Sequence, residues 1–338
     1  MAQYKVVFIE GLFPDMNIEK EILKKVDAEI VVGNCRTEDE VIELAHDADA
    51  LVAYSFKPIS DYLMSNIKKC KIIVRGGIGV DTVDIPAATK NGIIIANLPG
   101  YCINEVSDLT MAMMLSLLYK LPVAMSSTGG GEWNRDLVKP LRSLRKLTVG
   151  IIGFGNIGRT SARKATAFGM KILFYDPFVE TDIKIRDSEA KKVELDELLA
   201  KSDVILLHAP LNDRTYHIIN KETLRKMKKG TILINTARGG LIETEALVAA
   251  LKSGRIAGAG LDLIENVPPF GKNHPLLRFD NIIITPYYAW YTEDSAVLAR
   301  ESIAREIARV LGGYYPRAMV NPEVKPVARA GKLKEEEK

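Results

Sequence analysis

Three glycines and one acid carry the clearest chemistry in this chain. Gly153, Gly155 and Gly158 follow a short apolar run, and Asp176 stands 23 residues beyond Gly153, at the end of a second apolar run. Gly153 permits a tight strand-to-helix turn, Gly155 lets the backbone approach a pyrophosphate, and Gly158 lets the helix pack close to the strand. The helix N-terminus offers N–H groups and partial positive charge to phosphates, and Asp176 can accept hydrogen bonds from an adenosine ribose diol. The pattern predicts a dinucleotide site that favours NAD over NADP, because a carboxylate would repel a 2′-phosphate.

A second candidate is an arginine that follows a β-branched run. Arg238 lies within Ile234-Asn-Thr-Ala-Arg-Gly-Gly240, directly after a predicted strand. At the carboxyl end of a strand in a cofactor-binding sheet, its side chain can reach the nicotinamide side of the site. The planar guanidinium suits a carboxylate or a ketone oxygen. Taken without this context, Arg238 fits a surface ion pair equally well.

The elements that must position these residues alternate between β-branched strands and helical patterns. In the first hundred residues, the predicted strands are Tyr4–Ile9, Glu29–Val32, Ala50–Ala53, Ile72–Arg75 and Ile93–Asn97. In the second unit, the predicted strands are Thr148–Ile152, Lys171–Tyr175, Val204–Leu207, Thr231–Asn235, Ala257–Asp262 and Ile282–Thr285. Strands that alternate with helices predict parallel sheets covered on both faces.

This order predicts two doubly wound α/β domains, one nested in the other. A Rossmann NAD-binding domain over residues 100–291 is expected to be inserted in a flavodoxin-like substrate domain formed by residues 1–99 and 292–325. The cleft between two such domains is the default ligand site. Residues 326–338 are charged and poor in large apolar side chains, so we expect a loose tail there.

Composition excludes several other classes of protein. A net charge of +3, spread along 338 residues, argues against direct binding of nucleic acid. The three cysteines have neither disulfide nor metal-site spacing, which favours a reducing compartment and no metal site. The first ten residues predict a strand rather than a signal peptide, and no apolar run has the length of a bilayer span. We therefore expect a cytoplasmic protein without a membrane partner.

Taken together, the motifs resemble those of the D-2-hydroxyacid dehydrogenases. They occur in that family's order: the glycine loop, Phe174-Tyr-Asp-Pro177, Leu207-His-Ala-Pro210, Asn235-Thr-Ala-Arg-Gly-Gly240, Gly258-Ala-Gly-Leu-Asp262 and Thr285-Pro286. The run Arg75-Gly-Gly-Ile-Gly-Val-Asp81 resembles the family's loop for the substrate carboxylate. Two segments, Ala289-Trp-Tyr-Thr-Glu293 and Gly239-Gly-Leu241, look most like the C-terminal binding protein (CtBP-like) branch, which contains NAD-binding corepressors and bacterial relatives. The resemblance extends from about residue 4 to residue 324.

The resemblance implies NAD as the cofactor and a small carboxylate-bearing substrate. The substrate-binding residues that it implies are Arg75, Gly76, Gly77, Ile78 and Trp290. The cofactor-binding residues that it adds to the glycine loop and Asp176 are Thr110, Asn156, Ile157, His208, Ala209, Pro210, Asn212, Thr215, Thr236, Ala237, Arg238, Asp262 and Tyr287. It also implies a homodimer, and the apolar helix expected over residues 101–121, capped by Asn104, fits either the core or a subunit contact.

The catalytic positions depart from the family's pattern. The family uses an arginine, a glutamate and a histidine, and Arg238 matches the arginine. The glutamate's position, before Pro268, holds Val267, and the histidine's position, after Pro286, holds Tyr287. A phenol has an ordinary pKa of about 10, so in its neutral form it can donate a proton to a developing alkoxide but is a poor base. We hypothesise that Tyr287 is a proton donor; the alternative is that it only fills the pocket.

Neighbouring side chains offer other substitutes. Glu265 lies two residues before Val267 and is a candidate carboxylate, although an exposed loop residue is the simpler interpretation. His274 is the only plausible stand-in histidine. A set of aromatic residues is expected near the cleft and would favour a bulkier or flatter substrate, unless it serves only packing: Tyr101, Tyr287, Tyr288, Trp290 and Tyr291.

Three functions remain open at this point. The preferred one is an NAD-dependent oxidoreductase that acts on a carboxylate-bearing hydroxy or keto compound with atypical acid–base chemistry. The second is a non-catalytic NAD-binding module that regulates partner proteins, like a corepressor. The third is an enzyme that uses bound NAD transiently in a net non-redox reaction, such as elimination or epimerisation.

Overall fold

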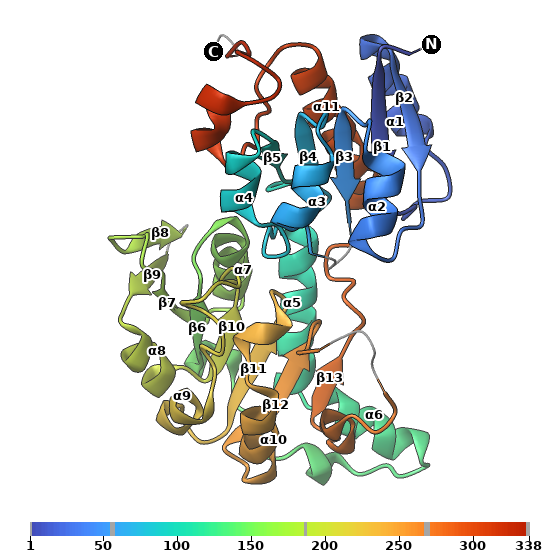
Figure 1. Cartoon of the computed structure of the whole chain (residues 1–338). Helices are drawn as coiled ribbons and strands as arrows, with labels where there is room; N and C mark the ends of the chain where they lie inside the picture. The colour runs from blue at the N-terminus through green and yellow to red at the C-terminus, as the bar shows by residue number, and fades with distance from the viewer. Residues whose placement is uncertain (1, 55–57, 186–187, 267–270, 336–338) are drawn as a thin grey trace. The chain divides into compact units, whose positions relative to one another are not determined.

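The structure is a computed structural model that falls into two compact α/β units (Figure 1). Unit 1 comprises Met1–Tyr101 and Thr292–Lys338, and unit 2 comprises Cys102–Tyr291. The structure describes four stretches of the chain, residues 2–54, 58–185, 188–266 and 271–335. Each unit is a mainly parallel sheet between layers of helices, so the predicted fold class is confirmed.

Unit 1 is built on a five-stranded parallel sheet in the order β2-β1-β3-β4-β5. This is the flavodoxin-like strand order. Every residue of β3 and β4 is buried, as expected for strands that helices cover on both faces. The strands are β1 (Tyr4–Phe8), β2 (Ala28–Val32), β3 (Ala50–Ala53), β4 (Ile72–Arg75) and β5 (Ile94–Ala96).

The helices of unit 1 come from both ends of the chain. They are α1 (Asn17–Leu23), α2 (Glu38–Ala45), α3 (Asp61–Asn66), α4 (Ile85–Lys90) and α11 (Glu293–Leu311). A buried ion pair joins α1 to α11: Arg300 donates from Nε and Nη2 to the two carboxylate oxygens of Glu19, at 2.8 Å each. The Glu19 side chain is fully buried, so its charge depends on this partner.

The C-terminal segment packs onto unit 1, so the prediction of a loose tail is wrong for residues 326–335. The Arg329 amide donates to the Gly92 carbonyl at 2.7 Å, and its Nη1 donates to the Ile67 carbonyl at 2.6 Å, at the end of α3. Further on, Tyr315 N donates to the Lys334 carbonyl at 3.0 Å. The composition was misleading because these contacts use main-chain carbonyls and one guanidinium rather than a run of apolar side chains.

Unit 2 contains an eight-stranded sheet in the order β13-β12-β11-β10-β6-β7-β9-β8. Its strands are β6 (Thr148–Ile152), β7 (Lys171–Tyr175), β8 (Ile183–Ile185), β9 (Ser188–Lys192), β10 (Val204–Leu207), β11 (Thr231–Asn235), β12 (Ile256–Leu261) and β13 (Ile282–Ile284). From β9 through β7, β6, β10 and β11 to β12, the order is that of the Rossmann fold. The sequence predicted six strands and missed β8, at the edge of the sheet, and its neighbour β9, because β8 is very short and β9 is largely polar, so neither has the apolar run of a covered strand.

The helices of unit 2 are α5 (Ile103–Leu118), α6 (Leu121–Gly129), α7 (Asn156–Ala167), α8 (Leu195–Lys201), α9 (Lys221–Lys226) and α10 (Thr244–Lys252). The helix predicted over residues 101–121 is α5, which begins after Cys102, so Asn104 lies in its first turn rather than at its cap. Its Met113 and Met114 are buried in one cluster with side chains of β6 and α7. Gly260 of β12 permits this packing, since a Cβ there would lie 2.9 Å from Met113 Cβ. The buried face of α5 is therefore core, one of the two interpretations that the sequence left open, while Leu109, Leu115 and Leu118 of the same helix are only partly buried.

Within the described stretches, no single helix combines the length and apolar composition of a bilayer span; the bent pair α5 and α6 does so jointly, on length and composition alone. No group of three or more His, Cys, Asp or Glu suited to a metal ion occurs in the same stretches.

The packed C-terminal segment leads to a stability prediction. We expect Arg329→Ala to lower the free energy of unfolding by about 1–3 kcal/mol, because buried carbonyls lose a charged donor. Urea unfolding followed by circular dichroism measures this change. Lys332→Ala is the matched control, since Lys332 is exposed in the same segment. Equal unfolding midpoints for the two variants would contradict the packing described here.

Candidate functional site

The glycine loop after β6 has the shape of a pyrophosphate cradle. Gly153 has a φ of +90°, and a Cβ there would lie 2.5 Å from Ala209 N. A Cβ on Gly158 would lie 2.3 Å from the Gly153 carbonyl oxygen, so the first turn of α7 packs directly on the loop. Gly155 has no atom within 4 Å of its Cβ position and faces open space. Two glycines thus serve close packing, and the third leaves the N-terminus of α7 open to a phosphate, which fits NAD.

Asp176 lies at the mouth of this cradle, as predicted. Its Oδ2 accepts from Phe154 N at 2.7 Å, and its Oδ1 accepts from Phe178 N at 2.8 Å. These amides fix the carboxylate beside the loop. Each carboxylate oxygen has two lone pairs, so the group can still accept hydrogen bonds from a ribose diol. Arg159 points back to the loop, donating from Nε to the Phe154 carbonyl at 2.9 Å.

The end of β10 meets the same loop. His208 and Ala209 lie directly under Gly153, where they leave no room for a side chain. The ring Nε2 of His208 lies 2.9 Å from Ser161 Oγ of α7. Burial lowers the pKa of His208 to about 3, so the ring is neutral at physiological pH. His208 therefore ties β10 to α7 and adds no charge near the cradle.

The next residues form a tight turn at the same edge of the sheet. Thr215 Oγ1 donates to the Pro210 carbonyl at 2.6 Å and accepts from Asn212 N at 2.9 Å. Asn212 Oδ1 in turn accepts from Arg214 N at 3.0 Å. The cofactor candidates Pro210, Asn212 and Thr215 are thus brought together, and Asn156 and Ile157 form the first turn of α7.

Arg238 lies in a turn that the side chain of Asn235 shapes. The fully buried Asn235 donates from Nδ2 to the Arg238 carbonyl at 2.7 Å and accepts from Ala237 N at 3.0 Å. The Arg238 Nη1 donates to the Ala237 carbonyl at 2.8 Å. Thr236 lies between Asn235 and Ala237 in the chain. Its hydroxyl oxygen is 2.8 Å from the hydroxyl oxygen of Thr110, and this hydrogen bond joins the end of β11 to α5. Arg238 is therefore held at the carboxyl end of β11, as predicted.

Asp262 organises the loop that carries Tyr287. Its carboxylate accepts from Thr285 Oγ1 at 2.6 Å, from Tyr288 N at 3.1 Å and from Ala289 N at 3.0 Å. Its carbonyl accepts from Tyr287 N at 2.9 Å, and Tyr287 has a φ of +55°. Burial raises the pKa of the Asp262 carboxyl, although these hydrogen bonds act in the opposite direction. Asp262 was predicted as a cofactor residue, but in this structure its carboxylate also supports the Tyr287 loop.

Glu265 is not an exposed loop residue, so that interpretation is wrong. Its side chain is only 15% exposed, and its Oε1 lies 2.6 Å from His217 Nε2. Its Oε2 accepts from Thr244 N at 2.8 Å. No role was assigned to His217 from the sequence, and no spacing signals a partner 48 residues away. Val267, which the resemblance places at the position of the family's glutamate, lies outside the described residues.

The other stand-in candidate is also engaged. His274 accepts from Leu276 N through Nδ1 at 3.3 Å and caps a short 3-10 helix, Pro275–Arg278. Among the aromatic candidates, Tyr288 and Tyr291 are more than two-fifths exposed, whereas Tyr101 is buried. Trp290 is half-buried and packs edge-on against Tyr291, with ring centroids 5.3 Å apart.

The predicted carboxylate loop of unit 1 has fewer available amides than expected. Gly76 N donates to the Ala53 carbonyl at 2.9 Å, and Gly77 N donates to the Arg75 carbonyl at 2.8 Å. These two donors are already used inside the unit, which leaves the Ile78 amide as the stronger candidate. The Arg75 side chain lies against Gly77, and within the described stretches its buried Nε has no hydrogen-bond partner. An anionic ligand would satisfy that donor.

Proteins of known family resemble this chain over most of its length. Residues 111–289 match the family described as "D-isomer specific 2-hydroxyacid dehydrogenase, NAD binding domain". The chain is 36% identical over 343 residues to a glyoxylate reductase of Thermofilum pendens, with 99% of each chain covered. It is 40% identical over 318 residues to a D-3-phosphoglycerate dehydrogenase of Methanocaldococcus jannaschii; this covers 93% of the chain but only 59% of that longer protein.

A solved structure gives the same result. The D-lactate dehydrogenase of Aquifex aeolicus, complexed with NAD and lactic acid, superposes with a TM-score of 0.82 at 31% identity, covering 91% of this chain and 96% of that one. The glycine cradle and Asp176 lie inside the matched NAD-binding segment. The chain therefore belongs to the D-isomer specific 2-hydroxyacid dehydrogenase family of oxidoreductases, and unit 2 contains its NAD-binding domain.

Proposed function

We propose that this chain is an NAD-dependent reductase of small 2-keto acids in which Tyr287 takes the place of the family's histidine as the proton donor. The observation that carries this proposal is the loop on Asp262, which holds Tyr287 by its backbone next to the end of β12. Val267 stands where the family has its glutamate, and this difference supports altered acid–base chemistry. The similarity to a glyoxylate reductase and a D-lactate dehydrogenase favours short 2-keto and 2-hydroxy acids as substrates.

The residues of unit 2 would bind and orient the reactants. The Gly153–Gly158 loop and the N-terminus of α7 receive the pyrophosphate, and Asp176 receives the adenosine ribose. When bound, reduced NAD supplies the hydride for C2 of the keto acid. Arg238 orients the keto acid and stabilises the negative charge that develops on its carbonyl oxygen. In unit 1, Arg75 and the Ile78 amide are the candidates for a carboxylate or other anionic group.

The proton for the reduced oxygen would come from the Tyr287 hydroxyl. In the reverse direction, the tyrosinate would take the proton back from the alcohol. The two other candidates have structural contacts, because Glu265 accepts from His217 and Thr244 and His274 accepts from Leu276.

A non-catalytic, CtBP-like NAD-binding module is the second candidate function. It is favoured by the loss of both acid–base residues of the family and by the segment Ala289-Trp-Tyr-Thr-Glu293. Its signature would be tight NAD binding without turnover of glyoxylate, pyruvate or hydroxypyruvate. An enzyme that uses bound NAD transiently would instead convert a substrate with no net change in the cofactor.

A homodimer is a further part of the proposal, with a different surface from the one that α5 suggested. Large apolar side chains are exposed along α6 and the segment after it: Leu121, Met125, Trp133, Leu137 and Leu141. Trp133 is 95% exposed and Met125 is 70% exposed, which is costly for a lone chain in water. A second copy of the chain is the occupant that we propose for this face.

The first prediction from the proposed function concerns Tyr287. Replacement of Tyr287 by Phe removes the proposed donor, so kcat for keto acid reduction should fall by about tenfold or more. The affinity for reduced NAD, measured by fluorescence titration, should stay within about twofold. Tyr288→Phe is the control, since Tyr288 is the exposed neighbour in the same loop. An unchanged kcat in Tyr287→Phe would contradict the proton-donor role.

The second prediction concerns cofactor choice. Asp176→Asn removes the charge that would repel a 2′-phosphate, so the preference for NAD over NADP should drop by about tenfold. Calorimetric titration with both cofactors measures this ratio, and the exposed Asp196→Asn serves as a charge-matched control. If the ratio is the same in both variants, the ribose role of Asp176 is wrong.

The third prediction concerns the subunit contact. The wild-type chain should elute in light-scattering chromatography at twice its 37.4 kDa mass. Trp133→Asp together with Met125→Asp should shift it to the monomer mass, because two charges would be buried without partners. Leu298→Asp, on the exposed side of α11, should leave the dimer intact. A monomeric wild-type chain would overturn the proposal.

A further inference from the structure

We infer that Glu265 and His217 are a pair of positioning residues that fix the turn carrying Arg238. The inference rests on the role proposed for Arg238, and neither residue is needed to touch the substrate. It assigns a task to two side chains that the proposed mechanism does not use.

The contact between the Glu265 and His217 side chains is short and largely shielded from solvent. Glu265 Oε1 lies 2.6 Å from His217 Nε2, and their side chains are 15% and 27% exposed. The second carboxylate oxygen accepts from Thr244 N, at the start of α10. Burial alone would raise the pKa of Glu265, but the hydrogen bonds from His217 and Thr244 outweigh it and hold the pKa below its ordinary value. The carboxylate is therefore charged when it binds the imidazole.

The backbone of His217 is bonded to one side of the Arg238 turn. His217 N donates to the Gly240 carbonyl at 2.8 Å, and Ile219 N donates to the Leu241 carbonyl at 3.0 Å. The loop after β10 is thus joined to the residues that directly follow Arg238.

The backbone next to Glu265 packs against the other side of the Arg238 turn. A Cβ on Gly239 would lie 2.3 Å from the carbonyl carbon and oxygen of Ile264 and 2.8 Å from Glu265 N. No side chain separates these two segments. The turn is therefore held between the His217 segment and the Ile264–Glu265 segment, and the Glu265–His217 contact closes this clamp.

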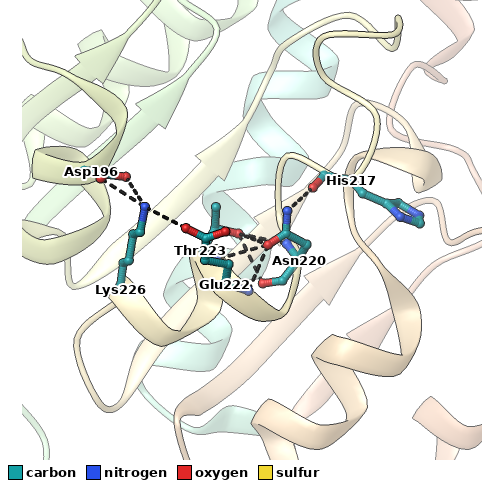
Figure 2. A network of polar contacts seen from close by, with 6 residues as sticks. All are labelled: Asp196, His217, Asn220, Glu222, Thr223 and Lys226. Carbon is teal, nitrogen blue, oxygen red and sulfur yellow. Dashed lines mark hydrogen bonds and ion pairs between the residues drawn. The ribbon is translucent and has the colours of Figure 1, made fainter.

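Two backbone conformations show that the clamp imposes a geometry on the chain. His217 has a φ of +50° and Asn266 a φ of +58°, in the left-handed region that residues other than glycine rarely adopt. Such conformations persist where the surroundings fix them. Asn220 Nδ2 fixes the His217 carbonyl from the cap of α9 at 2.9 Å, and Figure 2 shows the ring directed away from that cap. The ring is thus presented to Glu265 rather than to α9.

The clamp has a direct consequence for recognition. The guanidinium of Arg238 is carried by a turn that the Asn235 side chain anchors to β11 through the Arg238 carbonyl. A small displacement of an orienting group is enough to lose much of its effect on the reactant. Loss of the pair should therefore weaken the Arg238 contact with a keto acid while leaving the adenosine half of the NAD site, at Gly153 and Asp176, as it is.

The test uses the full chain and two readouts. We expect His217→Ala and Glu265→Gln to speed amide hydrogen exchange at Leu241 and Ile242 by about fivefold, because these amides close the Arg238 turn on the carbonyls of Arg238 and Gly239. In glyoxylate reduction, KM should rise by about fivefold or more, while the affinity for reduced NAD stays within about twofold. His217→Gln keeps a donor near the position of Nε2 and should restore most of both properties.

The matched control removes another carboxylate from the same part of unit 2. Asp196 pairs with Lys226 at 3.0 Å, close to the α9 cap drawn in Figure 2, and Asp196→Asn should change neither readout. If the pair had a merely structural role, its loss would lower the affinity for reduced NAD as well as raise KM for glyoxylate. This outcome would overturn the inference. Unchanged exchange in both His217→Ala and Glu265→Gln would overturn it as well. If the wild-type chain reduces no 2-keto acid, the proposed function fails, but hydrogen exchange still decides whether the pair holds the turn.

Discussion

At the carboxyl edge of the unit 2 sheet, the loops rest on one another backbone to backbone. Gly153 lies on His208 and Ala209, and Gly239 lies on the Ile264 carbonyl, at separations that leave no space for a Cβ. Loops in such contact have no flexible side chains between them to absorb a shift. The cofactor cradle and the Arg238 turn therefore keep the spacing that the strands impose. The roles proposed for the glycine loop and for Arg238 depend on this constraint.

A second layer of polar side chains sets the directions of these loops. Asn235 shapes the Arg238 turn, Asp262 supports the Tyr287 loop, and Glu265 joins two further loops. All three stand at or just after the carboxyl ends of β11 and β12, where strands give a rigid base. Buried polar groups with satisfied hydrogen bonds specify one loop geometry, because each alternative would leave a donor or acceptor unpaired.

The sequence predicted the features that depend on local patterns. The strands that carry the site, the glycine loop and Asp176 were found because apolar runs and glycine spacing are local signals. The pairing of His217 with Glu265 was not found, because it joins residues 48 positions apart and no periodicity records such a contact. The use of the Gly76 and Gly77 amides inside unit 1 was equally hidden, since it depends on the exact course of the backbone.

The buried Arg300–Glu19 pair also bears on how the chain is made. All five strands of unit 1 lie in the first hundred residues, yet the cation that neutralises Glu19 comes 281 positions later. During synthesis from the N-terminus, Glu19 has no Arg300 until the whole of Cys102–Tyr291 has left the ribosome. The packing of α1 against α11 can therefore be completed only after unit 2 has been synthesised.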